Sequence, residues 1–206
     1  MSGKDVPDII VSRLPLYLRS LQRMNEENRK VTSSQELGER LGISAAQIRK
    51  DLSQFGEFGK QGTGYNIDFL IEQLSKILHI DQEWDVVVVG AGDIGSAVAR
   101  YKGFQNRGFR VVMIFDDNPE KIGTRIGEFT VGDANDLTDS IKKARIQVAM
   151  IAVPVSNAQN VADRLIEAGI KAILNYAPIN LNVPADVNVQ YIDPSIHLQR
   201  MTYYLN

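Results

Sequence analysis

The stretch VVVVGAGDIG, residues 86–95, constrains the fold more than any other part of the chain. Its four consecutive valines are typical of a parallel strand that is buried on both faces. The pattern G-x-G-x-x-G recurs by chance, but here it follows a strand and opens a helix near Asp93, which is the context that the motif requires. In that context Gly90 makes the tight turn, Gly92 lets the backbone approach a pyrophosphate, and Gly95 lets the helix pack on the strand. The stretch therefore predicts a dinucleotide-binding unit.

The rest of the chain after residue 85 continues this pattern. A helical pattern runs from the glycine loop to about Arg107, and further apolar strands are predicted over 111–115, 147–153, 171–174 and 187–192. Strands that alternate with helices, with Gly or Pro where one changes to the other, predict a doubly wound parallel sheet. We therefore expect an α/β Rossmann domain over residues 81–192.

The residues of the glycine loop are the first candidates for cofactor binding. The N-terminus of the following helix offers free N–H groups and a partial positive charge to phosphates. The loop candidates are Gly90, Ala91, Gly92, Asp93, Ile94 and Gly95.

A carboxylate at the end of the second strand is the next candidate. Asp116 follows Gly95 by 21 residues, where an acidic side chain hydrogen-bonds the ribose hydroxyls and repels a 2′-phosphate. Its neighbour Asp117 is the alternative. Either carboxylate favours NAD or NADH over their phosphorylated counterparts.

Two later strand ends supply candidates for the nicotinamide half of the site. Ligands of such sheets lie at the carboxyl ends of the strands, which here bring in Val153 and Pro154, and Asn175 and Tyr176. No histidine occurs in these loops, and little sequence follows the last strand to hold a substrate. We therefore expect a nucleotide that is sensed and no catalytic residues; the alternative is a small NAD-dependent oxidoreductase with a helical dimerisation arm.

The first 80 residues are predominantly helical and form a second predicted domain. Ser33 and Glu36, and then Ser44 and Gln47, each match a capping box, and Gly42 lies between the two helices that they begin. Two short helices joined by a tight glycine turn predict a helix-turn-helix unit, whose second helix enters the major groove of DNA. An αα-hairpin with a solvated basic face is the alternative.

A glycine-rich stretch with aromatic anchors follows the second helix. Phe55, Phe58 and Tyr65 flank a predicted β-hairpin, which makes this the winged variant of the helix-turn-helix, unless the hairpin is a surface feature without a ligand. The DNA-binding candidates on the helix and hairpin are Ser44, Ala45, Gln47, Arg49, Lys50, Ser53, Lys60 and Gly62.

Composition limits the remaining classes of function. The net charge is −2, but residues 1–62 hold ten Lys and Arg against eight Asp and Glu, so the basic excess lies in the predicted DNA-binding part. The chain contains no cysteine and two histidines, which leaves a zinc or thiolate site poorly supplied. No apolar run approaches the length of about 18 residues typical of a membrane span. We expect a cytoplasmic protein without a metal.

Taken together, these motifs resemble the Rex family of redox-sensing transcriptional repressors. The resemblance rests on RLPLYLRSL (13–21), SAAQIRKDLSQFGEFGKQGTGYN (44–66), GAGDIG, FD (115–116), GIKAILNYAP (169–178) and LNVP (181–184). It implies a homodimer that binds a palindromic operator, senses the ratio of NADH to NAD⁺, and is released from DNA by NADH.

The resemblance also implies roles for residues that the motifs alone do not single out. Tyr101 would contact the cofactor, Arg13 and Asp193 would form an interdomain ion pair in one of two states, and residues 193–206 would form a helix exchanged between subunits. Pro194 departs from the family pattern, which usually has a larger apolar side chain directed at the partner's nicotinamide pocket.

Overall fold

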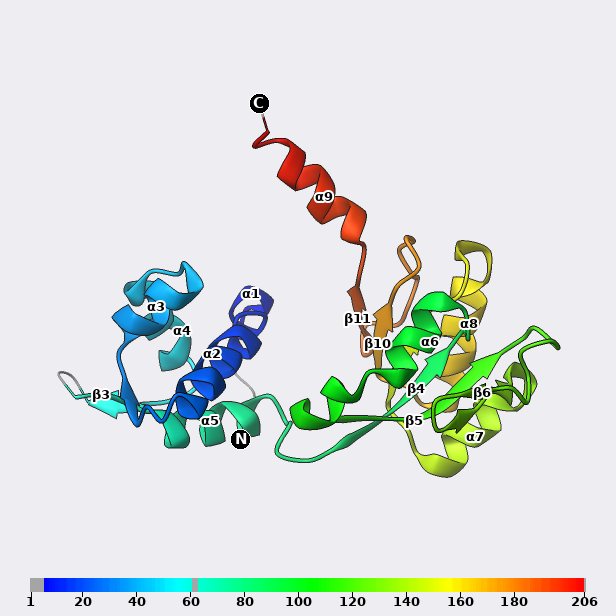
Figure 1. Cartoon of the computed structure of the whole chain (residues 1–206), viewed down its shortest axis with the longest axis horizontal. Coiled ribbons are helices and arrows are strands. Elements are labelled where there is room, and N and C mark those ends of the chain that lie inside the picture. The colour runs from blue at the N-terminus through cyan, green and yellow to red at the C-terminus, as the bar shows by residue number, and fades with distance from the viewer. Residues whose placement is uncertain (1–5, 61–62, 206) are drawn as a thin grey trace. The chain divides into compact units, whose positions relative to one another are not determined.

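The computed structural model describes residues 6–60 and 63–205, with Lys60 described by its backbone alone. The chain divides into two compact units, Met1–Gln82 and Glu83–Asn206 (Figure 1). Each unit has its own hydrophobic core, so each is described separately.

The first unit is a helical bundle with a small sheet. Its core is built from α2, α3, α4 and α5, which bury Leu14, Leu37, Ile48 and Leu70 among others. The elements in chain order are α1 (Asp8–Val11), α2 (Leu14–Glu26), β1 (Val31–Thr32), α3 (Ser34–Leu41), α4 (Ala45–Ser53), β2 (Gly59–Lys60), β3 (Gly64–Asn66) and α5 (Ile67–Ile77).

The helix-turn-helix is formed by α3 and α4, and the capping residues that the sequence predicts begin both helices. Ser33 Oγ accepts a hydrogen bond from the Glu36 N–H at 3.1 Å, and Ser44 Oγ accepts one from the Gln47 N–H at 3.2 Å. Gly42 ends α3 with a φ of +68°, a left-handed conformation that a glycine adopts without strain.

The wing follows α4 as predicted. Strands β2 and β3 pair antiparallel, with Gly59 opposite Tyr65, and β1 adds to the other edge of β3 in the order β1-β3-β2. Phe55, Phe58 and Tyr65 pack against the core of the unit and anchor the wing. Gly62, a predicted DNA contact, lies outside the described residues.

The second unit contains a six-stranded parallel sheet in the order β11-β10-β9-β4-β5-β8. Numbered by position in the chain and read from the β8 edge, this is the order 3-2-1-4-5-6 of the doubly wound Rossmann fold, which confirms the predicted fold class. Its elements are β4 (Trp84–Val89), α6 (Asp93–Arg100), the 3₁₀ helix η1 (Lys102–Arg107), β5 (Phe109–Asp116), β6 (Arg125–Ile126), β7 (Phe129–Thr130), β8 (Gly132–Asp133), η2 (Ala134–Asp136), α7 (Leu137–Ala144), β9 (Val148–Ile151), α8 (Val155–Ala168), β10 (Ala172–Asn175), β11 (Asn188–Tyr191) and α9 (Pro194–Thr202).

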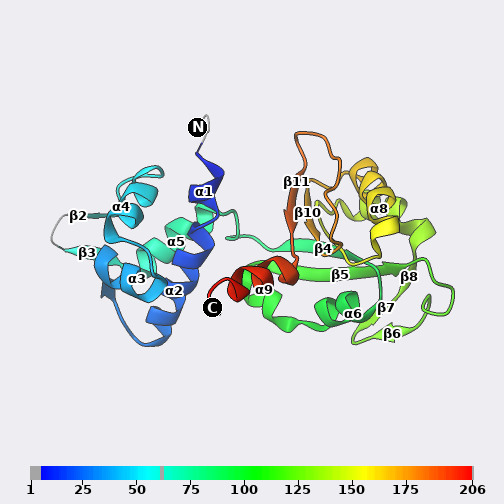
Figure 2. The same cartoon turned by 90° about the horizontal axis from the view of Figure 1, so that it is seen from above.

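Both faces of this sheet are covered, which explains the run of valines in β4. Val87 and Val89 pack with α7 and α8 on one face, whereas Val86 and Val88 pack towards α6 on the other. Figure 2 shows α8 and α6 on opposite sides of the sheet. All four valine side chains are therefore buried, so the strand lacks the polar alternation of a half-exposed one.

Two features of this unit differ from the prediction. The helix after the glycine loop ends at Arg100 rather than near Arg107, because Tyr101 takes an extended backbone and η1 follows it. A β-carbon on Gly103 would stand 2.4 Å from the Tyr101 ring, so the ring packs directly on this glycine. The short strands β6, β7 and β8 were not predicted, since two residues each are too few to show a period.

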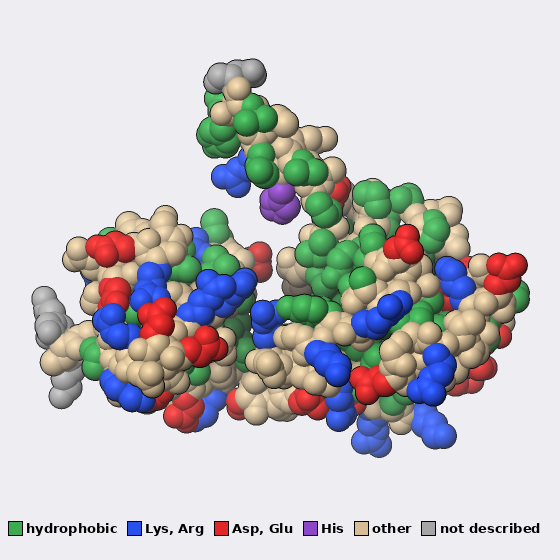
Figure 3. Space-filling view, viewed as in Figure 1, with side chains coloured by type: hydrophobic (Ala, Val, Ile, Leu, Met, Phe, Trp, Pro, Cys, Tyr) green, Lys and Arg blue, Asp and Glu red, His purple; other side chains and the backbone are tan. Residues whose placement is uncertain are grey.

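Helix α9 buries none of its residues. Figure 1 shows it leaving the end of β11 and standing clear of the other elements of its unit, and Figure 3 shows apolar side chains along it. The exposed large apolar residues of α9 and of the segment that follows it are Ile196, Leu198, Met201, Tyr203, Tyr204 and Leu205, each at least 60% exposed.

No described helix is long and apolar enough to cross a bilayer. The described side chains also contain no group of three or more His, Cys, Asp or Glu that could hold a metal ion.

Candidate functional site

The glycine loop after β4 has the geometry that its sequence predicts. Gly90 has a φ of +100°, and a β-carbon there would stand 2.4 Å from the Ala152 carbonyl oxygen. A β-carbon on Gly95 would stand 1.7 Å from the Gly90 carbonyl oxygen, because α6 crosses closely over the loop. Around Gly92, in contrast, a β-carbon would meet no atom within 4 Å. Two of the glycines thus allow close packing within the chain, and the third leaves open space.

That open space belongs to a cavity of about 870 Å³ at the carboxyl ends of β4 and β9. In chain order these are the first and fourth strands of the sheet, and they lie side by side. The cavity therefore lies where the strand order reverses, which is the usual ligand site of the fold. Gly92 is the N-cap of α6, and no side chain caps the helix. The first N–H groups of α6 are therefore available to a phosphate.

Asp116, at the end of β5, lines the same cavity and is 6% exposed. Its Oδ2 accepts from the Ala91 N–H at 2.6 Å and from Lys121 Nζ at 3.2 Å, and its Oδ1 accepts from the Asn118 N–H at 2.8 Å. Burial raises the pKa of the Asp116 carboxyl, but these hydrogen bonds outweigh it and lower the pKa overall. The group is an anion at neutral pH, and three donors leave a carboxylate about one lone-pair site for a ribose hydroxyl.

We expect Asp116→Asn to weaken the binding of NADH about tenfold. The variant should also show a smaller preference for NADH over NADPH, because the charge that repels a 2′-phosphate is removed. Fluorescence titration with each nucleotide measures both effects. Asp117→Asn decides between the two carboxylates, because Asp117 lines the same cavity but is exposed. We expect it to change the binding of both nucleotides less than Asp116→Asn does. Unchanged binding of both nucleotides by the Asp116 variant would remove Asp116 from the site.

The cavity gathers most, but not all, of the predicted cofactor residues. Gly90, Gly92, Asp93, Ile94, Asp116, Val153 and Pro154 line it. Ala91 and Gly95 shape the loop from behind, through the hydrogen bond to Asp116 and the contact with Gly90.

Asn175 and Tyr176 do not line this cavity. Asn175 is 1% exposed, and its Nδ2 donates to the carbonyl oxygens of Ala177 and Ile179 while its Oδ1 accepts from the Ala177 N–H. Its side chain therefore shapes the turn after β10. Tyr176 packs against the core around α6, and this burial raises the pKa of its hydroxyl.

The cavity also contains residues that the sequence reasoning missed. One side of α8 contributes Ser156, Asn157, Asn160, Val161 and Arg164, and the segment after β5 contributes Asn118 and Lys121. The signal for the first group was the helical spacing of polar residues after Pro154. Lys121 could not be singled out, because nothing in the sequence distinguishes it from other surface lysines.

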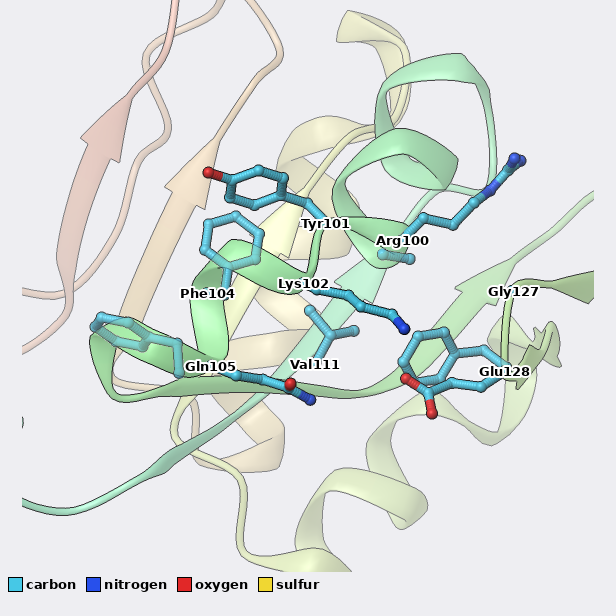
Figure 4. Close-up of a pocket in the computed structure, with 11 residues that line it drawn as sticks. Arg100, Tyr101, Lys102, Phe104, Gln105, Val111, Gly127 and Glu128 are labelled. Atoms are coloured by element: carbon cyan, nitrogen blue, oxygen red, sulfur yellow. The ribbon is translucent and has the colours of Figure 1, made fainter.

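Tyr101 lies at a second, smaller cavity of about 300 Å³, between the C-terminal end of α6, η1 and the β6–β7 hairpin. Figure 4 shows its ring beside that of Phe104, and the two rings meet edge to face with centroids 4.9 Å apart. The Tyr101 hydroxyl accepts a hydrogen bond from Arg107 Nη1 at 3.2 Å. The two cavities lie at opposite ends of α6, so Tyr101 does not line the cavity of the glycine loop.

The recognition helix α4 presents a narrower surface than the sequence suggests. Its exposed residues are Ala46, Arg49, Lys50 and Ser53, whereas Ala45 and Gln47 are half-buried. Arg49 Nη1 donates to Ser34 Oγ at 2.8 Å, which holds the guanidinium near the start of α3. Ser44 caps the helix, and Lys60 lies in β2 of the wing.

A buried carboxylate ties α4 to α2. Asp51 is fully buried, and Arg13 binds it with Nε at 2.6 Å from Oδ2 and Nη2 at 2.8 Å from Oδ1. The Tyr17 hydroxyl donates to Oδ2 at 2.6 Å, and Gln47 Nε2 donates to Oδ1 at 2.6 Å. The role of Asp51 could not be predicted from the sequence, because its partners Tyr17 and Arg13 lie 34 and 38 positions away in the chain.

The two residues of the predicted interdomain pair have other partners here. Arg13 is paired with Asp51, and Asp193 accepts hydrogen bonds from the backbone and side chain of Ser195 at the start of α9. Pro194 takes the first position of α9, where its missing N–H costs no hydrogen bond. An ion pair between Arg13 and Asp193 stays a prediction.

Comparison with known proteins adds to this geometry. A family model described as "CoA binding domain" matches residues 81–179, and one described as "Putative DNA-binding protein N-terminus" matches residues 5–53. The "Redox-sensing transcriptional repressor Rex" of Chloroflexus aggregans is 53% identical over 199 residues, which cover 97% of this chain and 94% of the relative. The protein of the same name from Desulforamulus reducens is 42% identical over 205 residues, covering 100% and 98%.

Solved structures of RSP, a Rex-family repressor, are also similar. A crystal structure of RSP in complex with beta-NAD⁺ and operator DNA gives a TM-score of 0.93 at 41% identity, covering 99% of this chain and 94% of that one. RSP in complex with beta-NADH gives a TM-score of 0.90 at 39% identity, covering 99% and 96%.

Proposed function

Because this chain belongs to the Rex family of redox-sensing transcriptional repressors, we propose that it binds a palindromic operator and that NADH releases it. The observation that carries the proposal is that a winged recognition helix and a dinucleotide cavity with a buried carboxylate occur on one chain. Relatives of this name are transcriptional regulators and not enzymes. A repressor of this kind acts in the cytoplasm, where the operator is.

Different residues of the cavity would contact two different parts of the cofactor. The N-terminus of α6 and Asp116 would hold the pyrophosphate and the adenine ribose, which NAD⁺ and NADH share. These contacts supply affinity without discrimination. The two forms differ in the charge and planarity of the nicotinamide ring, so the switch requires contacts at that end. Val153 and Pro154 line the same cavity and are our candidates for that end. Tyr101, Asn175 and Tyr176 lie outside this cavity in the single chain, so a contact from any of them would require a change of state.

The active form that we propose is a homodimer. The apolar side chains of α9 are exposed to water on the single chain, and exchange of this helix with a second copy would bury them. The proposed Arg13–Asp193 ion pair belongs to the same change of state. Forming it would draw the Arg13 guanidinium towards a carboxylate other than that of Asp51.

Release by NADH needs only a modest coupling between the two units. A palindromic operator requires two recognition helices about one turn of DNA, roughly 34 Å, apart. A cofactor that favours a dimer with misplaced helices weakens operator binding. A loss of 100-fold in affinity corresponds to about 2.7 kcal/mol of coupling free energy.

The experiment that tests this function is selection of bound duplexes from a random library by the purified chain. We expect a palindromic consensus. The rival class, a small NAD-dependent oxidoreductase, is tested with the same protein by following NADH absorbance in the presence of varied carbonyl compounds. Steady oxidation of NADH without a selected duplex would replace the repressor with the enzyme.

A further inference from the structure

The carboxylate of Asp51 can only accept hydrogen bonds, and this fixes the orientation of the Gln47 amide beside it. Its two oxygens receive four donors, two from Arg13, one from Tyr17 and one from Gln47. Burial raises the pKa of Asp51, but the hydrogen bonds from these three side chains outweigh it and lower the pKa overall. Asp51 is therefore ionised at neutral pH, and an ionised carboxylate only accepts hydrogen bonds.

This property determines which end of the Gln47 amide points inward. The amide approaches Asp51 Oδ1 at 2.6 Å, a distance at which its oxygen would be repelled by the carboxylate. Only the NH₂ group can occupy that place, so Nε2 is fixed inward on chemical grounds alone. The other end of the amide, Oε1, must then point away from Asp51.

The free end of the amide reaches solvent. Throughout the described part of the chain, every buried side-chain nitrogen or oxygen has a hydrogen-bond partner. Gln47 Oε1 has no partner among the described residues, so it is not a buried atom. Gln47 lies in the first turn of α4, next to the exposed Ala46, and side chains at the start of a recognition helix meet base edges.

We propose that Asp51 is a positioning residue for sequence recognition: it fixes the Gln47 amide so that Oε1 reads an exocyclic amine in the major groove. The bases that present such a donor are adenine, through N6, and cytosine, through N4. Guanine and thymine present acceptors at the corresponding place. Each half-site of the operator should therefore contain one position that Gln47 restricts to adenine or cytosine.

This inference rests on the proposed function, and its test keeps the two apart. Duplexes selected by the wild-type chain supply the consensus; if no duplex is selected, the proposed function fails before this test begins. With that consensus, single base changes are introduced symmetrically in both half-sites. The affinity of each duplex is then measured for full-length wild type, Gln47→Ala and Asp51→Asn.

We expect one symmetric position at which wild type prefers adenine or cytosine by about tenfold and at which both variants lose that preference. Asparagine at 51 can both donate and accept, so it no longer dictates the orientation of the Gln47 amide. Tyr17→Phe is the matched control, because it removes another hydrogen bond to Asp51 without changing the contact to Gln47. It should lower the melting temperature and leave the base preferences as they are.

Three results would overturn the proposal. An unchanged set of preferences in Gln47→Ala means that Gln47 reads no base. A lost preference in Gln47→Ala that Asp51→Asn retains means that Asp51 does not orient the amide. A loss in Tyr17→Phe equal to that in Asp51→Asn means a general loosening of α4. If Asp51→Asn does not fold, Gln47→Glu decides, because a carboxylate at 47 is repelled by Asp51 and should lose the base preference. A preference that Gln47→Glu keeps would mean that Asp51 does not position the side chain at 47.

Discussion

Replacing Gly92 with alanine should weaken NADH binding by about 100-fold while the chain keeps its stability. The backbone of Gly92 has φ −76° and ψ −167°, which alanine adopts without strain, and its β-carbon would meet no atom of the protein within 4 Å. That β-carbon would project into the cavity where a pyrophosphate must approach the backbone. Loss of about two charge-assisted hydrogen bonds corresponds to this decrease in affinity.

Two measurements check this prediction on the same protein. The melting temperature without cofactor should be unchanged or slightly raised, because alanine reduces the entropy of the unfolded chain. Operator binding without cofactor should also match wild type, whereas release should require about 100-fold more NADH. Release at the wild-type NADH concentration would mean that the phosphates do not lie on this loop.

Replacing Gly95 with alanine should have the opposite pattern, a large loss of stability. The added β-carbon would stand 1.7 Å from the carbonyl oxygen of Gly90, a backbone atom that cannot move aside without displacing β4 or α6. We expect the second unit to lose about 3 kcal/mol of unfolding free energy and about 10 °C of melting temperature.

The single tryptophan of the chain makes this measurable. Trp84 lies in β4, so its fluorescence during heating reports the unfolding of the second unit. Gly92→Ala is the matched control for Gly95→Ala, since it adds the same methyl group three residues away. Equal melting temperatures for the two variants would contradict the close crossing of α6 over the loop.

The sequence predicted the parts of this protein whose cause is local. Caps such as Ser33 and Ser44 act within three residues, and the valines of β4 show their burial directly. The glycine motif predicted the loop, and the apolar strand patterns predicted the cavity residues at and just after two strand ends, Asp116 and Val153. These signals were sufficient for the winged helix, the Rossmann sheet and part of the cavity lining.

The remaining features depend on distant contacts. Helix α6 stops where the Tyr101 ring packs on Gly103, and a period in the sequence carries no information about that contact. In the sequence, Asp51 resembles any other charged residue of a surface helix. Its role becomes visible only in the folded chain, where Arg13 and Tyr17 donate hydrogen bonds to it. Asn175 looked like a cofactor contact because it follows a strand, yet its hydrogen bonds shape a turn.

Coupling between cofactor binding and DNA affinity in this chain can be measured directly by titrating the operator complex. A fluorescently labelled duplex from the selection is bound to the full chain, and NADH and NAD⁺ are added in parallel while anisotropy is followed. We expect NADH to release the duplex and NAD⁺, at concentrations that fill the site, to leave it bound. Release by both nucleotides at the same occupancy, or by neither, would contradict this coupling.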